Sequence, residues 1–381
     1  MKSIPTFETQ LLRTDRMNRR ETDAALLSLI GYARSGAADY AWQRFQTAPW
    51  TSGDRNPRIL TIKGRLLKEL ALRASRAERP SLWRSAAEAY EQAAAAEPAS
   101  YPLINAASLY LLGGDQRGSA ATAEKVLALI ERDPDEPETP YYRAATRAEA
   151  LLLLDRHEEA QAAFAEGVAL GPRAWEDHAS TLRQFALILA AQGRDSGWLD
   201  AHRPPRSLHF GGHMSFDPKV VRREHLDEKI ANVLEEENVG FGFGALAAGA
   251  DIIIAEALLE RGAELHAVLP GGAEAFAAVS VDPFGKAWRR RFDAVLALAE
   301  TVRPVRPLGA EPDPVMIGLA DEVAMGAAIM NGRRLESSAA QLLVLDAAAS
   351  ADGASGRSLE IWAAGGWRQR ILTAARETRP G

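Results

Sequence analysis

Residues 239–270 read VGFGFGALAAGADIIIAEALLERGAELHAVLP. The stretch opens with a short apolar run, passes through small residues after Gly244, and continues as an amphipathic segment of helical length that stops at Gly262. A second apolar run, residues 264–269, ends at Pro270. Two strand-length apolar runs separated by a helical segment are typical of a βαβ unit with parallel strands. We therefore predict a strand at 239–243, a helix at 249–261 and a strand at 264–269.

The same alternation extends over the rest of the second half of the chain. Strand-like runs are followed by segments of helical length, and Gly, Pro or Asp separates them. Strands that alternate with helices form parallel sheets with helices on both faces. We therefore predict a doubly wound, Rossmann-like α/β domain over residues 203–381. Its further strands are predicted at 207–210, 302–305, 341–345 and 370–372, and its further helices at 224–237, 288–299, 313–332 and 358–364.

Residues 22–202 have a different pattern, in which one helix follows another. The segment is rich in Ala, Leu, Glu, Arg and Gln, which favour helices, and its short breaks contain Gly, Asp or Pro. Three stretches repeat one arrangement, in which an aromatic residue follows a small residue by four positions. A small residue lets two helices approach closely, the aromatic ring fills the groove between repeats, and a proline stops the helix. The three stretches contain Ala41 and Phe45; Ala86, Tyr90, Ala93 and Pro98; and Ala160, Phe164, Gly167 and Pro172.

This arrangement resembles the tetratricopeptide repeat. Residues 104–109, followed by Gly113-Gly114-Asp115, are similar to the TRAF-binding helical region of the apoptosis-signal-regulating kinases and its bacterial relatives. The resemblance implies an α-solenoid at residues 22–202 whose concave surface binds a peptide or protein partner. Pro204 and Pro205 end the helical pattern, so we expect the domain boundary at about residue 203 and a flexible N-terminus over residues 1–21.

Composition excludes several classes of function. A net charge of −6 predicts no general affinity for nucleic acid. The absence of cysteine excludes a disulfide framework, a thiolate metal site and a cysteine nucleophile, and no metal site is predicted. The first residues lack the apolar segment of a secretory signal, and charges interrupt apolar runs such as 251–259 well before about 18 residues. We therefore expect a cytoplasmic protein that does not bind membranes.

The candidate site lies where the predicted strands end. Ligands of doubly wound sheets bind beyond the carboxyl ends of the strands. Glycine lets backbone N–H groups approach an anion there, and a helix N-terminus adds further donors. We accordingly predict a site for a nucleotide or an NAD-derived small molecule, with no other cofactor. The predicted ligand-binding residues are Gly211, Gly212, His213, Gly244, Ala245, Gly249, Ala250, Asp251, Gly271, Asp346 and Gly356.

Each polar candidate also has a purely structural explanation. His213 either contacts a phosphate or base, or bonds its own backbone. Asp251 opens a helix, where a capping or dipole role explains an acid completely. Glu256 either faces a ribose or is a solvated helix residue. Asp346 either binds ribose hydroxyls or forms a turn.

Residues 242–251, 255–258, 261–264 and 268–270 together resemble the SLOG superfamily, which includes the DNA-processing protein DprA and the LOG-type phosphoribohydrolases. The resemblance covers most of residues 206–375 and is closest to SLOG-like domains of bacterial proteins that also carry helical repeats. It implies a Rossmann-like domain that binds a nucleotide-derived ligand. The LOG signature Pro-Gly-Gly-x-Gly-Thr-x-x-Glu is kept only as Pro270-Gly271-Gly272, one strand too early, so we regard that match as fortuitous. Residues 355–358 fall where relatives carry a Gly-Thr-type turn.

Three hypotheses follow. The first is a ligand-sensing adaptor in bacterial-type signalling or in a stress or defence response, with the ligand in the C-terminal domain and a protein partner on the repeats. The second is a nucleotide N-glycosidic hydrolase, with Glu256 or Asp346 as the acid. The third is a repeat scaffold that binds no ligand. Intact glycine turns without a recognised catalytic motif favour the first.

Overall fold

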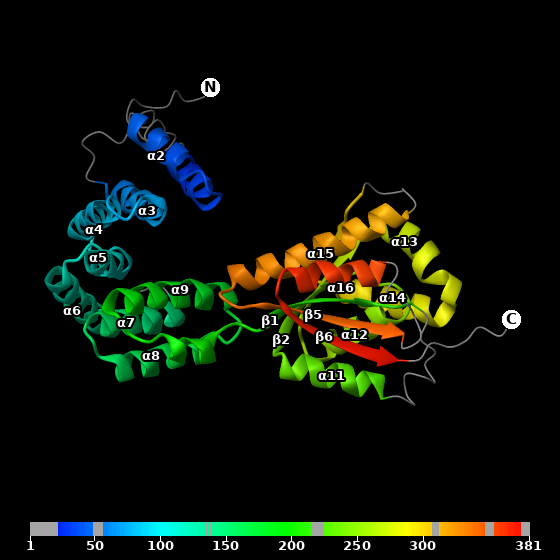
Figure 1. Ribbon diagram of the computed structural model, residues 1–381. Coiled ribbons are helices and arrows are strands. Elements are labelled where there is room, and N and C mark those ends of the chain that lie inside the picture. Colours follow the sequence, from blue (N-terminus) through cyan, green and yellow to red (C-terminus); the bar gives the residue numbers. More distant parts are fainter. Residues whose placement is uncertain are drawn as a thin grey trace, which may run out of the picture. The chain divides into compact units, whose positions relative to one another are not determined.

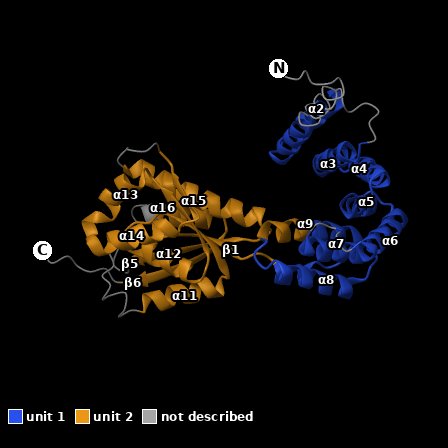
Figure 2. Ribbon diagram, turned by 180° about the vertical axis from the view of Figure 1, so that it is seen from behind, with its two compact units in different colours: residues 1–174, 183–202 blue, residues 175–182, 203–381 orange. Residues whose placement is uncertain are grey.

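The computed structural model describes residues 22–48, 56–133, 136, 139–214, 225–306, 312–346 and 354–374. The chain folds into helical repeats followed by a six-stranded, all-parallel sheet with helices on its faces, which confirms the predicted fold class (Figure 1). It divides into two compact units, residues 1–174 with 183–202, and residues 175–182 with 203–381 (Figure 2). The predicted flexible segment, residues 1–21, lies outside the described residues.

The first unit consists of successive helices joined by short turns. The side chains of Asn56, Asp115 and Thr139 cap three of these helices by accepting a backbone N–H from the first turn. The helices cover residues 22–34, α2 (Ala38–Thr47), α3 (Pro57–Arg73), α4 (Arg79–Ala96), α5 (Ser100–Leu112), α6 (Gln116–Arg132), α7 (Pro140–Leu153), α8 (His157–Leu170), α9 (Trp175–Gln192) and the short 3₁₀ helix η1 (Gly197–His202). The first turns of α9, residues 175–182, belong to the second unit.

The repeated small-and-aromatic arrangement forms the contacts between helices, as predicted. Its residues on α2, α4 and α8 are buried: Ala41, Phe45, Ala86, Tyr90, Ala93, Ala160, Phe164 and Gly167. Gly64 of α3 lies so close to the Tyr90 ring that a Cβ atom there would be 2.6 Å from a ring carbon. The missing side chain therefore permits the close approach of α3 and α4.

The sheet of the second unit has the strand order β4-β3-β2-β1-β5-β6, and every neighbouring pair is parallel. The chain thus moves outward from β1 to β4 and then returns to place β5 and β6 on the other side of β1. Gly211 and Gly212, which we predicted to follow the first strand, are its last two residues. The strands are β1 (Arg206–Gly212), β2 (Val239–Gly244), β3 (Glu264–Leu269), β4 (Thr301–Pro304), β5 (Ala339–Asp346) and β6 (Arg368–Ala374).

Helices cover both faces of this sheet (Figure 1). Right-handed crossovers place the helices after β1, β2 and β3 on one face, and the helices after β4 and β5 on the other. Leu208 and Phe210 of β1 point into the first layer, whereas Phe241 and Phe243 of β2 point into the second. The helices are α11 (Leu226–Glu236), α12 (Ala250–Glu260), α13 (Ala273–Ser280), η2 (Asp282–Phe284), α14 (Lys286–Leu298), α15 (Pro314–Arg334) and α16 (Ala354–Ala364).

Among the described helices, α15 alone is long and apolar enough to cross a membrane by length and composition. Its small residues Ala320, Ala324 and Ala328 are buried, and they pack against the phenylalanines of β2 and against Val268 of β3. α15 also contacts β1 and β5. This is the packing of a core helix in an α/β domain.

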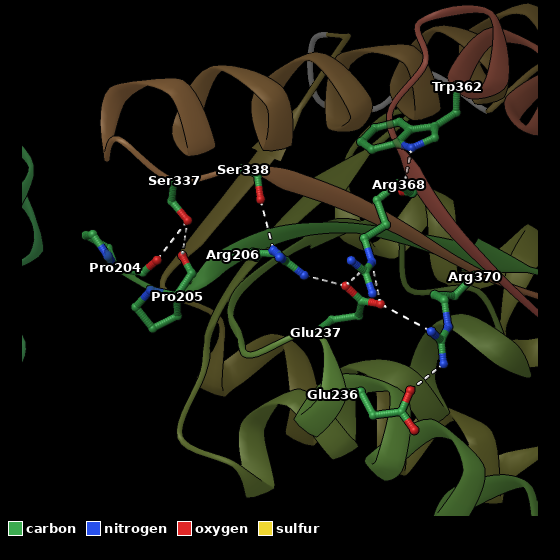
Figure 3. Close-up of polar contacts among 10 residues, drawn as sticks. All are labelled: Pro204, Pro205, Arg206, Glu236, Glu237, Ser337, Ser338, Trp362, Arg368 and Arg370. Carbon is green, nitrogen blue, oxygen red and sulfur yellow. Dashed lines mark hydrogen bonds and ion pairs between the residues drawn. The ribbon is translucent and has the colours of Figure 1, made fainter. Parts of the chain in front are cut away.

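A buried carboxylate joins three elements at the amino ends of the strands (Figure 3). The Glu237 side chain is 0% exposed, and its carboxylate pairs with Arg206 of β1 at 2.6 Å. It also pairs with Arg368 and Arg370 of β6, at 2.7 and 3.4 Å. A buried charge is tolerated when it is paired in this way. The Glu237 cluster therefore ties the edge strand β6 to β1 and to the end of α11.

Candidate ligand-binding site

The direction of winding reverses at β1, between β2 and β5, and a cavity lies beyond the carboxyl ends of these strands. In open α/β sheets such a reversal leaves a crevice in which ligands bind. The cavity has a volume of ≈ 250 Å³. Its lining comes from β1 and β5, from the segments that follow β1, β2 and β3, and from the four helices α12, α13, α15 and α16: Phe210, Gly211, Gly212, His213, Met214, Ala245, Ala247, Asp251, Pro270, Phe276, Ser280, Ile317, Ala320, Asp321, Leu343 and Ser358.

The end of β1 is held on both sides by backbone bonds. The His213 N–H donates to the carbonyl of Val344 at 2.9 Å, and the His213 carbonyl accepts the N–H of Ala250 at 3.2 Å. The Asp346 N–H donates to Nδ1 of the His213 ring at 2.6 Å. Asp346, the last residue of β5, thus orients His213 through its backbone, and His213 lines the cavity.

The two glycines of β1 differ in how tightly they are enclosed. A Cβ atom on Gly212 would lie 2.3 Å from the Val344 carbonyl oxygen and 2.7 Å from Cβ of Ala250, so no other residue fits there. A Cβ atom on Gly211 would have its nearest neighbours at 3.7 Å, on Leu343, and at 3.9 Å, on Asp251. These are ordinary contact distances, so an alanine at position 211 fits and places its methyl group at the wall of the cavity.

The turn from β2 to α12 is shaped by glycine. Gly249, directly before α12, has φ of 121°, a conformation that other residues rarely adopt. A Cβ atom on Gly244 would lie 2.6 Å from the Phe210 carbonyl oxygen. Gly244 and Gly249 are thus required by the backbone, while Ala245 and Ala247 between them face the cavity.

Asp251 is a buried carboxyl group at the cavity wall. It does not cap α12 in the usual way, because its Oδ2 accepts the N–H of Ala247, which precedes the helix, at 3.1 Å. Burial raises the pKa of the Asp251 carboxyl to about 7; bonds from the Ala247 and Gly212 N–H groups act to lower it, and the nearby charge of Asp321 raises it. An acid with a strongly shifted pKa in a cleft is a candidate for function.

Asp321, on α15, is the second carboxyl group of the cavity, and a chain of buried polar side chains holds it. Its Oδ1 lies 2.9 Å from Nε2 of His209, which is fully buried in the middle of β1. Nδ1 of His209 lies 3.0 Å from Nε2 of Gln341 on β5. The Gln341 amide also donates to Oγ of Ser358 on α16, at 3.1 Å.

The remaining predicted residues take different places around this cavity. Gly271 lies between Pro270, which lines the cavity, and the start of α13. Gly356 falls in the first turn of α16 and not in a turn before it, because that helix begins at Ala354. Glu256 is absent from the described lining and pairs with Arg291 of α14 through two bonds, at 2.8 and 2.5 Å.

Sequence reasoning missed Asp321, His209 and Gln341. The segment 313–332 was predicted as a helix, but periodicity does not show which of its acids points at another strand. His209 and Gln341 lie inside apolar runs, where a polar residue on a strand signals a buried partner. That signal was present in the sequence. No group of three or more His, Asp or Glu residues among the described residues is arranged to hold a metal ion.

Residues 9–110 match the family described as Tetratricopeptide Repeats-Sensor. The match covers roughly a quarter of the chain, and the described part of it, residues 22–48 and 56–110, falls on helices of the first unit. No curated protein matches the chain. The first unit therefore carries repeats of a kind that generally serves protein interaction or sensing.

Proposed function

We propose that this chain is a ligand-sensing adaptor, which binds a nucleotide or an NAD-derived molecule in the second unit and a protein partner on the repeats. The observation that carries the proposal is the cavity at the reversal of the sheet. It lies where open α/β sheets bind ligands, and it is lined by small residues and larger apolar side chains with a few polar groups. The resemblance of residues 242–251 to the SLOG superfamily supports the same ligand class.

The repeats supply the partner surface in this proposal. Within the first unit, a groove of ≈ 550 Å³ lies between the helix at 22–34, α3 and the α4–α5 turn, inside the segment that matches the sensor repeats. Leu27 and Tyr101 on its wall are 69% and 48% exposed. They adjoin Leu26, Ile30 and Pro102 on the same wall, and a contiguous apolar surface is typical of sites that bind another protein.

A thermal-shift screen of the full chain tests the proposal. The compounds are mononucleotides, dinucleotides, cyclic nucleotides, NAD and ADP-ribose. A compound present at about 100 times its Kd should stabilise the unit that binds it by about 2.7 kcal/mol. Gly211→Ala adds a methyl group at the cavity wall without a close contact, so we expect it to keep the fold and to remove or weaken the shift.

Gly326→Ala is the matched control, because Gly326 lies on the exposed side of α15 with open space around it. It should respond to every compound as the wild type does. If no compound shifts the wild type, the adaptor proposal is wrong and the scaffold hypothesis takes its place. An equal shift in wild type and Gly211→Ala would put the ligand elsewhere.

Hydrolysis of an N-glycosidic bond is a second candidate, and one observation favours it. A general acid works best when its pKa lies near the working pH. The pKa of Asp251 is about 7 and this residue lines the cavity, whereas Glu256 is paired with Arg291. Release of free base from a compound found in the screen, measured by chromatography, distinguishes a hydrolase from a sensor.

A further inference from the structure

The charges of the cavity wall limit what the cavity accepts. Among its described lining residues, the carboxyl groups of Asp251 and Asp321 are the acidic ones, and none is lysine or arginine. A phosphate placed there would bring further negative charge beside these two carboxyl groups and would lose its hydration without gaining a cation. The lining therefore favours a group that donates hydrogen bonds and carries no negative charge.

The size and the apolar part of the wall indicate which portion of a nucleotide fits. A volume of ≈ 250 Å³ is below the roughly 300–1,000 Å³ that is usual for whole small-molecule ligands. Flat or bulky apolar side chains form much of the lining: Phe210, Pro270, Phe276, Ile317 and Leu343. Such a wall suits the faces of a sugar and a base, and it has room for only part of a dinucleotide.

The polar chain behind Asp321 presents one carboxylate to this space. The Gln341 amide donates to Nδ1 of His209, which leaves Nε2 of the ring to donate to Asp321. His209 and Gln341 are both fully buried, and burying such groups is costly unless every bond is made. The Asp321 side chain remains 28% exposed, so the carboxylate can still accept a bond from a ligand.

We propose that the cavity receives the ribose-bearing, phosphate-free end of a nucleotide, that Asp321 accepts hydrogen bonds from its hydroxyl groups, and that His209 positions Asp321. This inference rests on the proposed ligand-sensing function and specifies which part of the ligand enters. The phosphates stay outside the described wall of the cavity. Asp321 contacts the ligand in this account, and His209 acts only through Asp321.

Calorimetric titration of the full chain tests the inference. The probes are adenosine, guanosine, cytidine, uridine and nicotinamide riboside, the four nucleoside 5′-diphosphates ADP, GDP, CDP and UDP, the 2′-deoxy forms of these four nucleosides, and inorganic pyrophosphate. We expect the Kd of at least one ribonucleoside to lie within about tenfold of the Kd of its diphosphate. Alternatively, nicotinamide riboside should bind with a micromolar to millimolar Kd, which corresponds to a binding free energy of about 8 to 4 kcal/mol. Pyrophosphate should neither bind nor compete.

Two variants test the contact made by Asp321 and the positioning of Asp321 by His209. Asp321→Asn and His209→Phe should both weaken ribonucleoside binding about tenfold or more, and both should reduce the preference for ribose over 2′-deoxyribose. Glu322→Gln is the matched control, because Glu322 is the next residue of α15 but pairs with Arg357 at the surface. It should leave both the affinity and the sugar preference unchanged.

The outcomes distinguish this inference from the proposed function. If the diphosphates bind, no nucleoside binds and pyrophosphate competes with the diphosphates, the inference is wrong. The ligand-sensing function would still stand in that case. The inference is also wrong if Asp321→Asn, like Glu322→Gln, leaves the ribonucleoside affinity and the sugar preference unchanged. Failure of every probe would overturn the inference, while the proposed function would still be decided by the thermal-shift screen, which also contains dinucleotides, cyclic nucleotides, NAD and ADP-ribose. The comparison of nucleosides with pyrophosphate uses the wild type, so it holds even where a variant does not fold.

Discussion

Among the single residues, Asp251 should make the stability of the folded chain depend on pH. Its pKa in the folded chain is about 7, against an ordinary value of 3.8, because the side chain is buried. Between about pH 4 and pH 7 the folded state keeps a proton that the unfolded state has lost. Stability from this group is therefore greatest at low pH and falls as the pH rises through that range.

The side chain of the Asp251→Asn variant cannot titrate, so its free energy of unfolding does not decrease in this way as the pH rises. Relative to wild type, the variant should gain on the order of 2–3 kcal/mol of unfolding free energy between pH 5 and pH 8. Urea unfolding at several pH values measures the difference. Asp227→Asn, at an exposed position on α11, is the control and should show no such slope. A difference between Asp251→Asn and wild type that does not change with pH would contradict the burial of this carboxyl group.

The polar site residues could be predicted from the sequence only where they directly follow a predicted strand. His213 and Asp251 follow strands that the sequence identifies, and both line the cavity. Asp321 reaches the cavity from a helix 70 positions further along the chain, through packing that local patterns do not encode. Asp346 directs its backbone N–H to His213, a role that residue type does not reveal.

At the scale of elements, one substitution should have opposite effects on two helices. Gly64→Ala removes a flexible residue from α3 but places Cβ 2.6 Å from the buried Tyr90 ring, so we expect a net loss of about 1–2 kcal/mol. Gly326→Ala adds a methyl group to open space on α15 and should stabilise by about 0.5–1 kcal/mol. Urea unfolding of both variants checks the signs. If both substitutions changed the free energy of unfolding in the same direction, the close packing of α3 on α4 would be contradicted.

The Glu237 cluster predicts how firmly the edge strand is held. Glu237→Gln removes the buried charge that three partly exposed arginines share, so we expect a loss of about 1–3 kcal/mol and faster hydrogen exchange in β6. Glu235→Gln is the control, because its carboxylate pairs with Arg261 at the surface and is 76% exposed. That change should cost about 1 kcal/mol or less. Unaltered exchange in β6 of Glu237→Gln would contradict the role of the cluster.

Element types were predictable from periodicity, and element ends were less so. The helix predicted at 358–364 begins at Ala354, and the strand predicted at 207–210 continues through Gly212. The helix α13 was not predicted, since Gly271 and Gly272 indicate a turn and the eight residues that follow are too few for a clear period. Packing against the sheet determines these ends, and local pattern does not.

At the scale of the whole molecule, the sequence predicted the fold class but not the strand order. Alternating strands and helices indicate a parallel sheet, and repeated small and aromatic residues indicate a helical solenoid. The return of the chain from β4 to the far side of β1 depends on which strand edges pair, and it creates the crevice. The cavity is thus a property of the topology, whereas its glycines are visible in the sequence.

Binding of a nucleotide or an NAD-derived ligand in this cavity is the proposed property on which the others depend. Hydrogen–deuterium exchange of the full chain, with and without the compound that gives the largest thermal shift, locates the bound compound. We expect slower exchange at residues 211–214, 245–251 and 317–321, which line the cavity or adjoin its lining residues. Protection confined to the repeats, or none at these three segments, would contradict binding in this cavity.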